Sequence, residues 1–334
     1  MSELRATRRG RAASPAALAT RHFRRDRAAI AWFTLLAALL LAFLAAPLYA
    51  EHVAGTSPSE NHLSDVIVVD GKRRHVVSID AQPIGPTWDK RYFLGADENG
   101  RDLAVRLLYG GRTSCFIGAC ALLLTILLAT PLALAAGYFG GRTDSVVSRL
   151  LDVIWSFPAL LLGVMLSTAL ALSGATIGPI TIEAGAKVVP IAVIGIVYVP
   201  YVARPLRGQV MALRGQLFVE AARASGAGPA RVMVSELLPH LWTTVLVLTP
   251  LMFANAIVLE SALSFLGAGV AAPEPSFGVL ISQGLGNVLL APHLLLVPCI
   301  AMVLVVLALS GVADGLRRAF DPHGALGVDA VHGQ

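Results

Sequence analysis

The chain has 334 residues, of which 56% are hydrophobic and only 14% are charged. Soluble domains carry about 25% charged residues, so this composition excludes an ordinary soluble enzyme and a disordered chain. It indicates a protein whose helices pack together in a membrane. Aromatic residues make up 7%, too few for a nucleic-acid stacking surface, so the net charge of +5 does not indicate nucleic-acid binding. The three cysteines lie in apolar runs and are interpreted as buried hydrophobic residues.

Six long stretches without charged residues are candidate membrane spans, since a spanning helix needs about 20 mostly apolar residues. The stretches are residues 28–50, 113–141, 153–182, 188–203, 237–259 and, within a longer run, 275–313. Residues 275–292 are expected outside the sixth helix. The fourth stretch is short, but Lys187 and Arg204 can extend their charged groups to the two membrane surfaces. The sequence therefore predicts an all-α membrane protein with six transmembrane helices.

The first stretch, residues 28–50, could be either a membrane span or a secretory signal. Its apolar run exceeds the roughly 7–15 residues of a signal core, and no clean Ala-x-Ala site precedes Glu51. We interpret it as an uncleaved first transmembrane helix.

Charge placement predicts the orientation, because arginine and lysine gather in the cytoplasmic connections of membrane proteins. Residues 1–27 hold eight arginines against two acids, and the connection 204–240 holds five arginines against two glutamates. The connections 173–187 and 267–291 hold one basic residue between them. We expect a basic cytoplasmic N-terminal tail at 1–27, a cytoplasmic connection at 204–240 and a cytoplasmic C-terminal tail at 314–334.

A long polar segment, residues 51–111, separates the first two spans and is expected outside the membrane. Within it, residues 66–69 and 75–79 are rich in β-forming side chains and flank the turn-forming pair Asp70-Gly71. This pattern predicts a small β hairpin, with four or five residues in the turn if residues 72–74 join it. Three histidines of the segment have irregular spacing, which favours solvated side chains over metal ligands: His52, His62 and His75.

The sequence contains no nucleotide-binding G-x-x-x-x-G-K-[ST] loop, no H-E-x-x-H and no G-x-S-x-G. Its predicted spans hold almost no carboxylates or histidines, which an intramembrane enzyme or an ion-coupled secondary transporter needs at membrane depth. Glu260 lies about 27 Å along the fifth helix at ~1.5 Å per residue, near the outer surface. We infer that the driving energy comes from another protein.

The connection 204–240 contains a pattern that predicts two short helices around a turn. Residues 220–225 favour a helix, Gly226 lies where a helix ends with positive φ, and Pro229 suits the first turn of a second helix. Small alanine side chains would let another protein approach closely. A plain interhelical loop with solvated charges is the alternative.

This connection resembles the EAA loop of ABC importer permeases. The matching residues, in the family's spacing, are Glu220, Ala221, Ala222, Gly226, Leu238 and Pro239. Position 236, commonly apolar in the family, is a glutamate here, so the contact of that residue is expected to differ. The resemblance implies that the matching residues couple the chain to ATPase subunits.

Further segments resemble the dipeptide, oligopeptide and nickel importer permeases, and among them the second permease subunit, which has the longer basic N-terminus. They occur in the family's order at residues 94–102, 106–112, 137–144, 149–152, 157–158, 260–267, 314–317 and 321–322. From the residues alone, 94–112 is either an interfacial helix, with Arg101 and Arg106 toward lipid headgroups, or a structural collar for the second span. Residues 137–142 form a tight turn that glycines permit, and the Arg142–Asp144 pair is interpreted as solvated.

Small residues at positions 261–269, at the end of the fifth span, either line or gate the transport path or serve plain helix packing. The candidates for a pathway or gate are Glu260, Ser264 and Gly267.

The resemblance implies a type I ABC importer permease fold, with a core permease domain at residues 112–313 and an extracytoplasmic segment after helix 1. It implies a non-catalytic subunit in the bacterial inner membrane that moves peptides, with nickel or another small solute as the alternative. The expected partners are a homologous second permease, two cytoplasmic ATPases and an extracytoplasmic solute-binding protein. No cofactor is expected in this chain, since ATP and Mg²⁺ would bind to the ATPases. A proton-coupled secondary transporter and a membrane scaffold are the rival classes.

Overall fold

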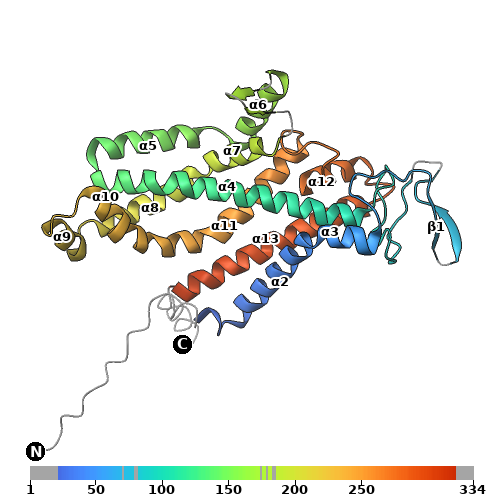
Figure 1. The fold of residues 1–334 in the computed structure, drawn as a ribbon, viewed down its shortest axis with the longest axis horizontal. Helices are drawn as coiled ribbons and strands as arrows, with labels where there is room; N and C mark the ends of the chain where they lie inside the picture. The colour runs from blue at the N-terminus through green and yellow to red at the C-terminus, as the bar shows by residue number, and fades with distance from the viewer. Residues whose placement is uncertain are drawn as a thin grey trace, which may run out of the picture.

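The computed structural model describes residues 22–69, 71–78, 82–173, 175–177, 180–182 and 186–320. These residues form an elongated bundle of long helices with short helices at one end and a loop-rich extension at the other (Figure 1). Most of the predicted basic tail and the last part of the predicted C-terminal tail lie outside the described residues.

Helices make up most of the described chain. In chain order they are α2 (Arg27–Leu44), α3 (Ala46–Tyr49), η1 (Ala50–Ala54), α4 (Leu103–Phe139), α5 (Gly141–Ser156), α6 (Ala159–Ser173), α7 (Val188–Val197), α8 (Val199–Leu213), α9 (Leu217–Ala224), α10 (Pro229–Arg231), η2 (Val232–Leu237), α11 (Leu238–Phe265), α12 (Phe277–Gly286) and α13 (His293–Phe320). Two antiparallel hairpins pair β1 (Val66–Val69) with β2 (Lys72–His75), and β3 (Ala175–Ile177) with β4 (Ile180–Ile182).

Five helical segments of the described chain are long and apolar enough to cross a membrane, and the bent pair α5 and α6 makes a sixth if it is counted as one span. Counted so, the described residues contain the six predicted spans. Two spans begin well before their uncharged stretches, because α4 starts at Leu103 and α10, η2 and α11 form one helical segment from Pro229 to Phe265.

The third span differs most from its predicted range, residues 153–182. Helix α5 already begins at Gly141, a bend of 80° separates it from α6, and residues 175–177 and 180–182 are the strands β3 and β4. The break falls at Pro158, which has no N–H to donate and clashes with a preceding helical turn.

Ion pairs hold the charged helix α5 against α8. Asp144 accepts two hydrogen bonds from the guanidinium of Arg207, and Asp152 accepts one from Arg204 at 2.7 Å. Asp144 therefore pairs with α8, so its interpretation as a solvated partner of Arg142 is wrong. A count of uncharged residues places α5 outside the span, because the count treats Asp144 and Asp152 as unpaired charges.

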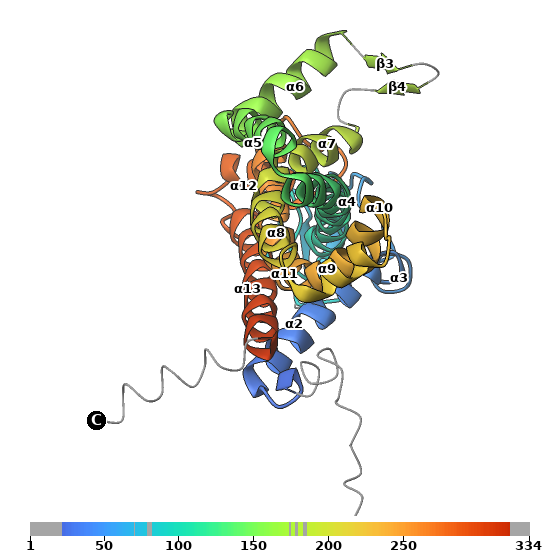
Figure 2. The same ribbon diagram turned by 90° about the vertical axis from the view of Figure 1, so that its left-hand side faces the viewer.

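Helix α4 packs against α7, α8 and α11 (Figure 2). Its Leu122, Ile117 and Cys115 each belong to a different cluster of buried apolar side chains, which α4 shares with α7, α8, α11 and α13. Cys115 is buried as predicted, whereas Cys120 and Cys299 are only half-buried.

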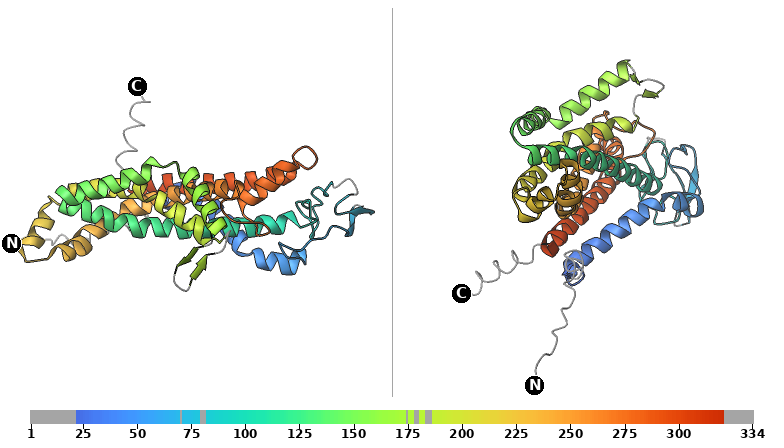
Figure 3. Two further views of the ribbon diagram at one scale, coloured as in Figure 1. Left: turned by 90° about the horizontal axis from the view of Figure 1, so that it is seen from above. Right: turned by 60° about the vertical axis from the view of Figure 1, so that its left-hand side comes forward.

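The terminal helices α2 and α13 lie side by side (Figures 1 and 3). Asp26 begins α2 by accepting the backbone N–H groups of Ala28 and Ala29, and it also binds Arg318 near the end of α13 at 2.8 Å. These backbone hydrogen bonds, with Arg318, hold the pKa of the Asp26 carboxyl below its usual range.

The loop segment, residues 55–102, contains the predicted hairpin, but its turn is shorter than predicted. Val69 pairs with Lys72, so only two residues connect the strands, and the second strand ends at His75, where it was expected to begin. Gly71 has a φ of +73°, as short hairpin turns require.

His62, interpreted from the sequence as solvated, is packed inside the loop segment. Its Nδ1 lies 3.1 Å from Asp65, its Nε2 lies 3.0 Å from the hydroxyl of Thr56, and its side chain is 15% exposed. That interpretation is therefore wrong for this histidine.

Of the two interpretations of residues 94–112, the interfacial helix is wrong. Residues 94–102 form turns, and Arg101 and Arg106 are buried instead of facing headgroups. Arg101 Nε binds Asp97 at 2.7 Å, and Arg106 Nη2 binds Gln283 of α12 at 2.9 Å. The alternative, a structural collar for the second span, fits these contacts.

Candidate functional site

The knob, residues 217–240, protrudes at the end of the bundle opposite the loop segment (Figure 1). Helix α9 ends at Ala224, Gly226 reverses the chain with a φ of +82°, and Pro229 is the first residue of α10. The predicted helix, glycine turn and second helix are therefore present. Pro239 lies in the first turn of α11, and the turn before α11, η2, is π-helical.

One face of the knob is packed against the bundle. Val219, Val232 and Leu237 are fully buried in a cluster that includes residues of α4, α8 and α11. The ring of Phe218 stacks on His240, with 4.9 Å between the ring centres. These contacts tie both ends of the knob to the spanning helices.

The six sequence-predicted coupling residues are divided between the exposed and the packed face. Glu220, Ala221, Gly226 and Pro239 are exposed, whereas Ala222 and Leu238 are half-buried against the cluster. A partner protein could therefore contact a carboxylate and small side chains on the outer face of the knob.

Two arginines that sequence reasoning counted only for orientation connect the knob end to the α4–α5 turn. The guanidinium of Arg223 lies over the ring of Tyr138, 4.8 Å from its centre. Arg214 donates a hydrogen bond to the carbonyl of Gly137 at 3.1 Å. The glycine-rich turn predicted at residues 137–142 thus supports the knob, with Gly140 and Gly141 both at positive φ.

The second candidate site lies near the other end of α11, where Glu260 is fully buried. The hydroxyl of Ser264 donates to its carboxylate at 2.7 Å, and the hydroxyls of Ser114 and Ser276 lie next to it. No cation pairs with Glu260 among the residues that the structure describes. A buried carboxylate without a cation is costly unless hydrogen bonds stabilise it, and the serines supply them.

The same serines hold the backbone that follows α11. Ser264 accepts the N–H of Val270 at 3.0 Å, Ser114 accepts that of Phe277 at 3.1 Å, and Ser276 accepts that of Val279 at 3.3 Å. The carboxylate of Glu260 accepts the hydroxyl of Ser264 and lies next to the other two hydroxyls. It therefore organises the α11–α12 connection, residues 266–276.

Gly267 ends α11 at a φ of +76°, in the left-handed region that glycine adopts most easily. Glu260 and Ser264 lie on one helix face because they are four residues apart, which a sequence pattern can detect. Ser114 and Ser276 come from other elements, and sequence reasoning missed both.

The described chain is a bundle of helices long and apolar enough to span a membrane, with a helical knob at one end. The fold is similar to that of the MetNI methionine ABC transporter in an inward-facing conformation, with a TM-score of 0.50. The sequences are 16% identical, and the match covers 64% of this chain and 95% of that chain.

Comparison with known sequences defines the family of the chain more narrowly than the fold does. Residues 129–323 match the family described as the binding-protein-dependent transport system inner membrane component. The oligopeptide transport system permease protein OppC of Haemophilus influenzae is 35% identical, over 71% of this chain and 72% of that protein. The dipeptide permease protein DppC of Alkalihalophilus pseudofirmus is 35% identical, over 69% and 72%. The glutathione permease protein GsiD of Pectobacterium atrosepticum is 32% identical, over 69% and 72%.

The chain belongs to the family of binding-protein-dependent transport system inner membrane components. This confirms the predicted family and the predicted all-α, multi-pass membrane fold, and it disfavours the secondary transporter and the scaffold. The family match begins at residue 129, so α2 and the loop segment lie outside it.

Proposed function

We propose that the chain is the permease subunit of an ABC importer for peptides. The observation that carries the proposal is the knob, which presents Glu220 and Ala221 at one end of a bundle of this family. The relatives are named for the transport of oligopeptides, dipeptides and glutathione, which is itself a short peptide. Their names favour a peptide over nickel, the alternative considered from the sequence.

The chain works with a homologous second permease, two cytoplasmic ATPases and an extracytoplasmic solute-binding protein. It lies in the bacterial inner membrane with both termini in the cytoplasm, as its charge asymmetry favours. ATP and Mg²⁺ bind to the ATPases, since this sequence has no nucleotide-binding loop.

The knob receives the motion of the ATPases. Glu220, Ala221, Ala222 and Gly226 contact the ATPase surface, and Leu238 and Pro239 pass the displacement directly into α11. This helix has 28 residues and is therefore about 42 Å long. Buried contacts pass part of this motion to α4 and α8.

The other end of α11 then acts on the outer end of the transport path. Glu260, Ser264 and Gly267 hold the α11–α12 connection, the proposed outer gate, on α11. This is the helix that the ATPases move. Glu260 and Ser264 act by positioning backbone, and neither of them needs to touch the cargo.

The test is uptake by proteoliposomes that contain the assembled importer. Labelled trialanine is expected to enter only when ATP, the binding protein and this chain are all present. The chain purified alone is expected to hydrolyse no ATP. Uptake of nickel without competition by peptides would contradict the proposed substrate, and ATP hydrolysis by this chain alone would contradict the proposed class.

A further inference from the structure

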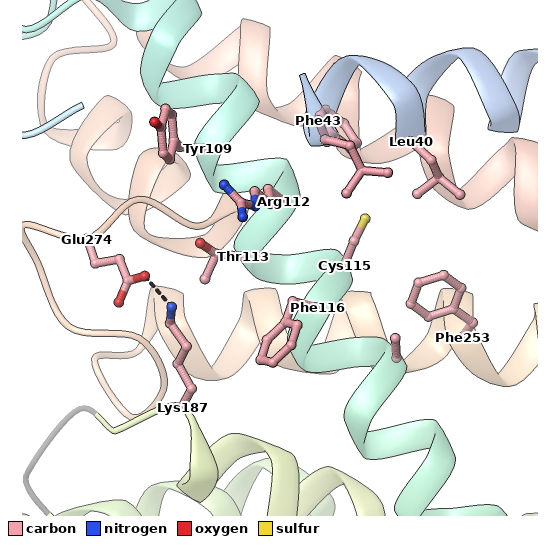
Figure 4. A pocket seen from close by; sticks show the side chains of 12 residues that line it. Leu40, Phe43, Tyr109, Arg112, Thr113, Cys115, Phe116, Lys187, Phe253 and Glu274 are labelled. Carbon is pink, nitrogen blue, oxygen red and sulfur yellow. Dashed lines mark ion pairs between the residues drawn. The ribbon is translucent and has the colours of Figure 1, made fainter. Parts of the chain in front are cut away.

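A cavity of about 740 Å³ lies beside α4, toward the end of the bundle that carries the loop segment (Figure 4). Its walls are largely apolar and include Phe43 of α2, Phe116 of α4 and Phe253 of α11. Pockets that enclose small molecules have roughly 300–1,000 Å³. The cavity is therefore large enough for a short peptide.

Three charged side chains line this apolar cavity: Arg112, Lys187 and Glu274. Lys187 Nζ lies 2.5 Å from Glu274 Oε1, and the pair closes one side of the cavity (Figure 4). Arg112 projects from the middle of the lining on α4 and makes no ion pair with any residue in the described part of the chain. The cavity thus has two cations and one anion, which favours a ligand with an anionic group.

The Arg112 side chain is exposed and has no carboxylate partner among the described residues, so its guanidinium is available to an anionic group of a ligand that enters the cavity. A carboxylate suits it, because arginine binds carboxylates through two parallel hydrogen bonds. The opposite end of a peptide is an ammonium group, which Glu274 can bind in place of Lys187.

We propose that this cavity is the cargo site at the outer end of the permease and that it holds a short peptide by its two ends. Arg112 binds the α-carboxylate and Glu274 binds the α-ammonium group, while the phenylalanine walls contact side chains of any sequence. This inference rests on the proposed function, since it requires that peptides are the cargo. It assigns the recognition of peptide ends to residues of the permease itself.

The Glu260 cluster explains how the cavity is linked to the knob. Glu274 lies in the α11–α12 connection, and Ser276, two residues later, lies next to Glu260. Phe253 of the cavity wall is also on α11. A displacement of α11 therefore moves two parts of the cavity lining relative to Arg112, which is fixed on α4.

The experiment measures protection of a cysteine inside the cavity. The three native cysteines are replaced by alanine, Phe116→Cys supplies the reporter, and the assembled importer is placed in vesicles of neutral lipid, with and without the binding protein. Trialanine is expected to slow alkylation of the reporter. Trialanine amide and N-acetyl-trialanine are each expected to bind about tenfold more weakly, because each lacks one charged end.

The decisive variant is Arg112→Gln, which is expected to abolish the preference for trialanine over its amide while the preference over the acetylated peptide persists. Arg142→Gln, an exposed arginine at the other end of the bundle, is the matched control and is expected to change neither preference. Complex recovery and basal ATP hydrolysis are measured for both, so that a folding defect is recognised.

Equal protection by trialanine and its amide in the unsubstituted chain would overturn the inference. Protection when anionic lipid is added to the vesicles, with none by peptide, would overturn it in favour of a lipid headgroup on Arg112. Absence of ATP-dependent trialanine uptake by the unsubstituted importer would instead reject the proposed function. Normal peptide uptake without protection of the reporter cysteine would reject the cargo site and leave the proposed function standing.

Discussion

Asp102 begins helix α4 and also attaches the loop segment to it. The residue is 1% exposed, and its carboxylate accepts the backbone N–H groups of Ala104 at 2.8 Å, Val105 at 3.2 Å and Tyr92 at 2.6 Å. The first two bonds cap the helix. The third comes from Tyr92, whose backbone has a φ of +60° and whose phenol has its pKa raised to about 12 by burial.

Asp102→Ala is expected to lower the free energy of unfolding by roughly 2–4 kcal/mol, because it removes a helix cap and leaves the Tyr92 N–H buried without an acceptor. Asp102→Asn keeps an acceptor oxygen and is expected to lose about half as much. Thermal unfolding of the purified complex in detergent measures both. Equal losses for the two variants would show that charge, and not hydrogen-bond acceptance, stabilises this junction.

Glu260 is the other residue whose single side chain organises a whole connection. Its carboxylate accepts the hydroxyl of Ser264 in α11 and lies next to hydroxyls from α4 and the start of α12. Without it, three buried hydroxyls must find new acceptors, although each still accepts a backbone N–H. The residue is therefore important for the conformation of residues 266–276.

Glu260→Ala is expected to lower the free energy of unfolding by about 3 kcal/mol or more, from unsatisfied hydroxyls and the space left behind. Glu260→Gln retains one acceptor oxygen and is expected to cost about 1 kcal/mol. Hydrogen exchange of the 266–279 amides should be faster in Glu260→Ala than in Glu260→Gln. Unchanged exchange in both would contradict the positioning role.

At the scale of elements, the knob is a rigid attachment to α11 and not a loose loop. Its buried valines fix α9 to the bundle, while Gly226 faces open space, since no atom lies within 4 Å of the place that a Cβ would take. A substitution at Gly226 therefore acts through backbone strain alone. Ala222 is half-buried, so a bulky side chain there would disturb the packing, and the exposed Ala221 is the better probe of partner contact.

Gly226→Val, Ala221→Trp and Glu220→Lys are expected to lower peptide uptake about tenfold or more, the effect of roughly 1.4 kcal/mol in coupling free energy. The valine strains a left-handed turn, the tryptophan blocks close approach, and the lysine reverses a charge. Uptake, ATPase recovery and permease abundance are measured together.

Ala230→Trp, on an exposed position of the same knob outside the coupling motif, is the control for bulk. Abundance in the membrane is expected to stay normal in all four variants, because these groups lie outside the apolar spans. Normal uptake in the three motif variants, with normal complex recovery, would show that the knob is a plain connector.

The elements that could be predicted from sequence are those with local signals. The glycine turn at Gly226, the hairpin at Val66–Val69 and the number of spans all follow from nearby residues. The range of the third span could not be predicted, because Asp144 is stabilised by Arg207, far away in the sequence. Likewise, nothing local in the sequence relates Ser114 to Glu260, since their contact depends on the packing of α4 against α11.

At the scale of the whole molecule, the bundle has two chemically different ends. One end carries the knob and the α4–α5 turn, where Arg214 and Arg223 make contacts. The other carries the loop segment, the α11–α12 connection and the cavity with Glu274. The proposed energy input and the proposed cargo site thus lie at opposite ends of the same helices, as a pump across a membrane requires.

This polarity predicts that the knob faces the cytoplasm and the α12–α13 connection faces outward, since arginines gather on the inner side. In a chain without native cysteines, Ser225→Cys and Leu289→Cys are expected to react from opposite sides of the membrane with an impermeant thiol reagent. Both positions suit the test, because Ser225 is exposed and Leu289 is 94% exposed. Ser276 would be a poor reporter, because it is fully buried.

Leu289→Cys should be labelled in intact cells stripped of their outer membrane, whereas Ser225→Cys should be labelled only in inverted vesicles or after permeabilisation. An odd number of spans between the two positions requires opposite sides, and α11 is the single long apolar helix between them, with α12 too short to cross. Labelling of both cysteines from the same side would therefore mean either that α11 does not span the membrane or that α12 enters it together with a neighbouring segment. In either case α11 would not connect the knob to the cavity across the membrane as proposed.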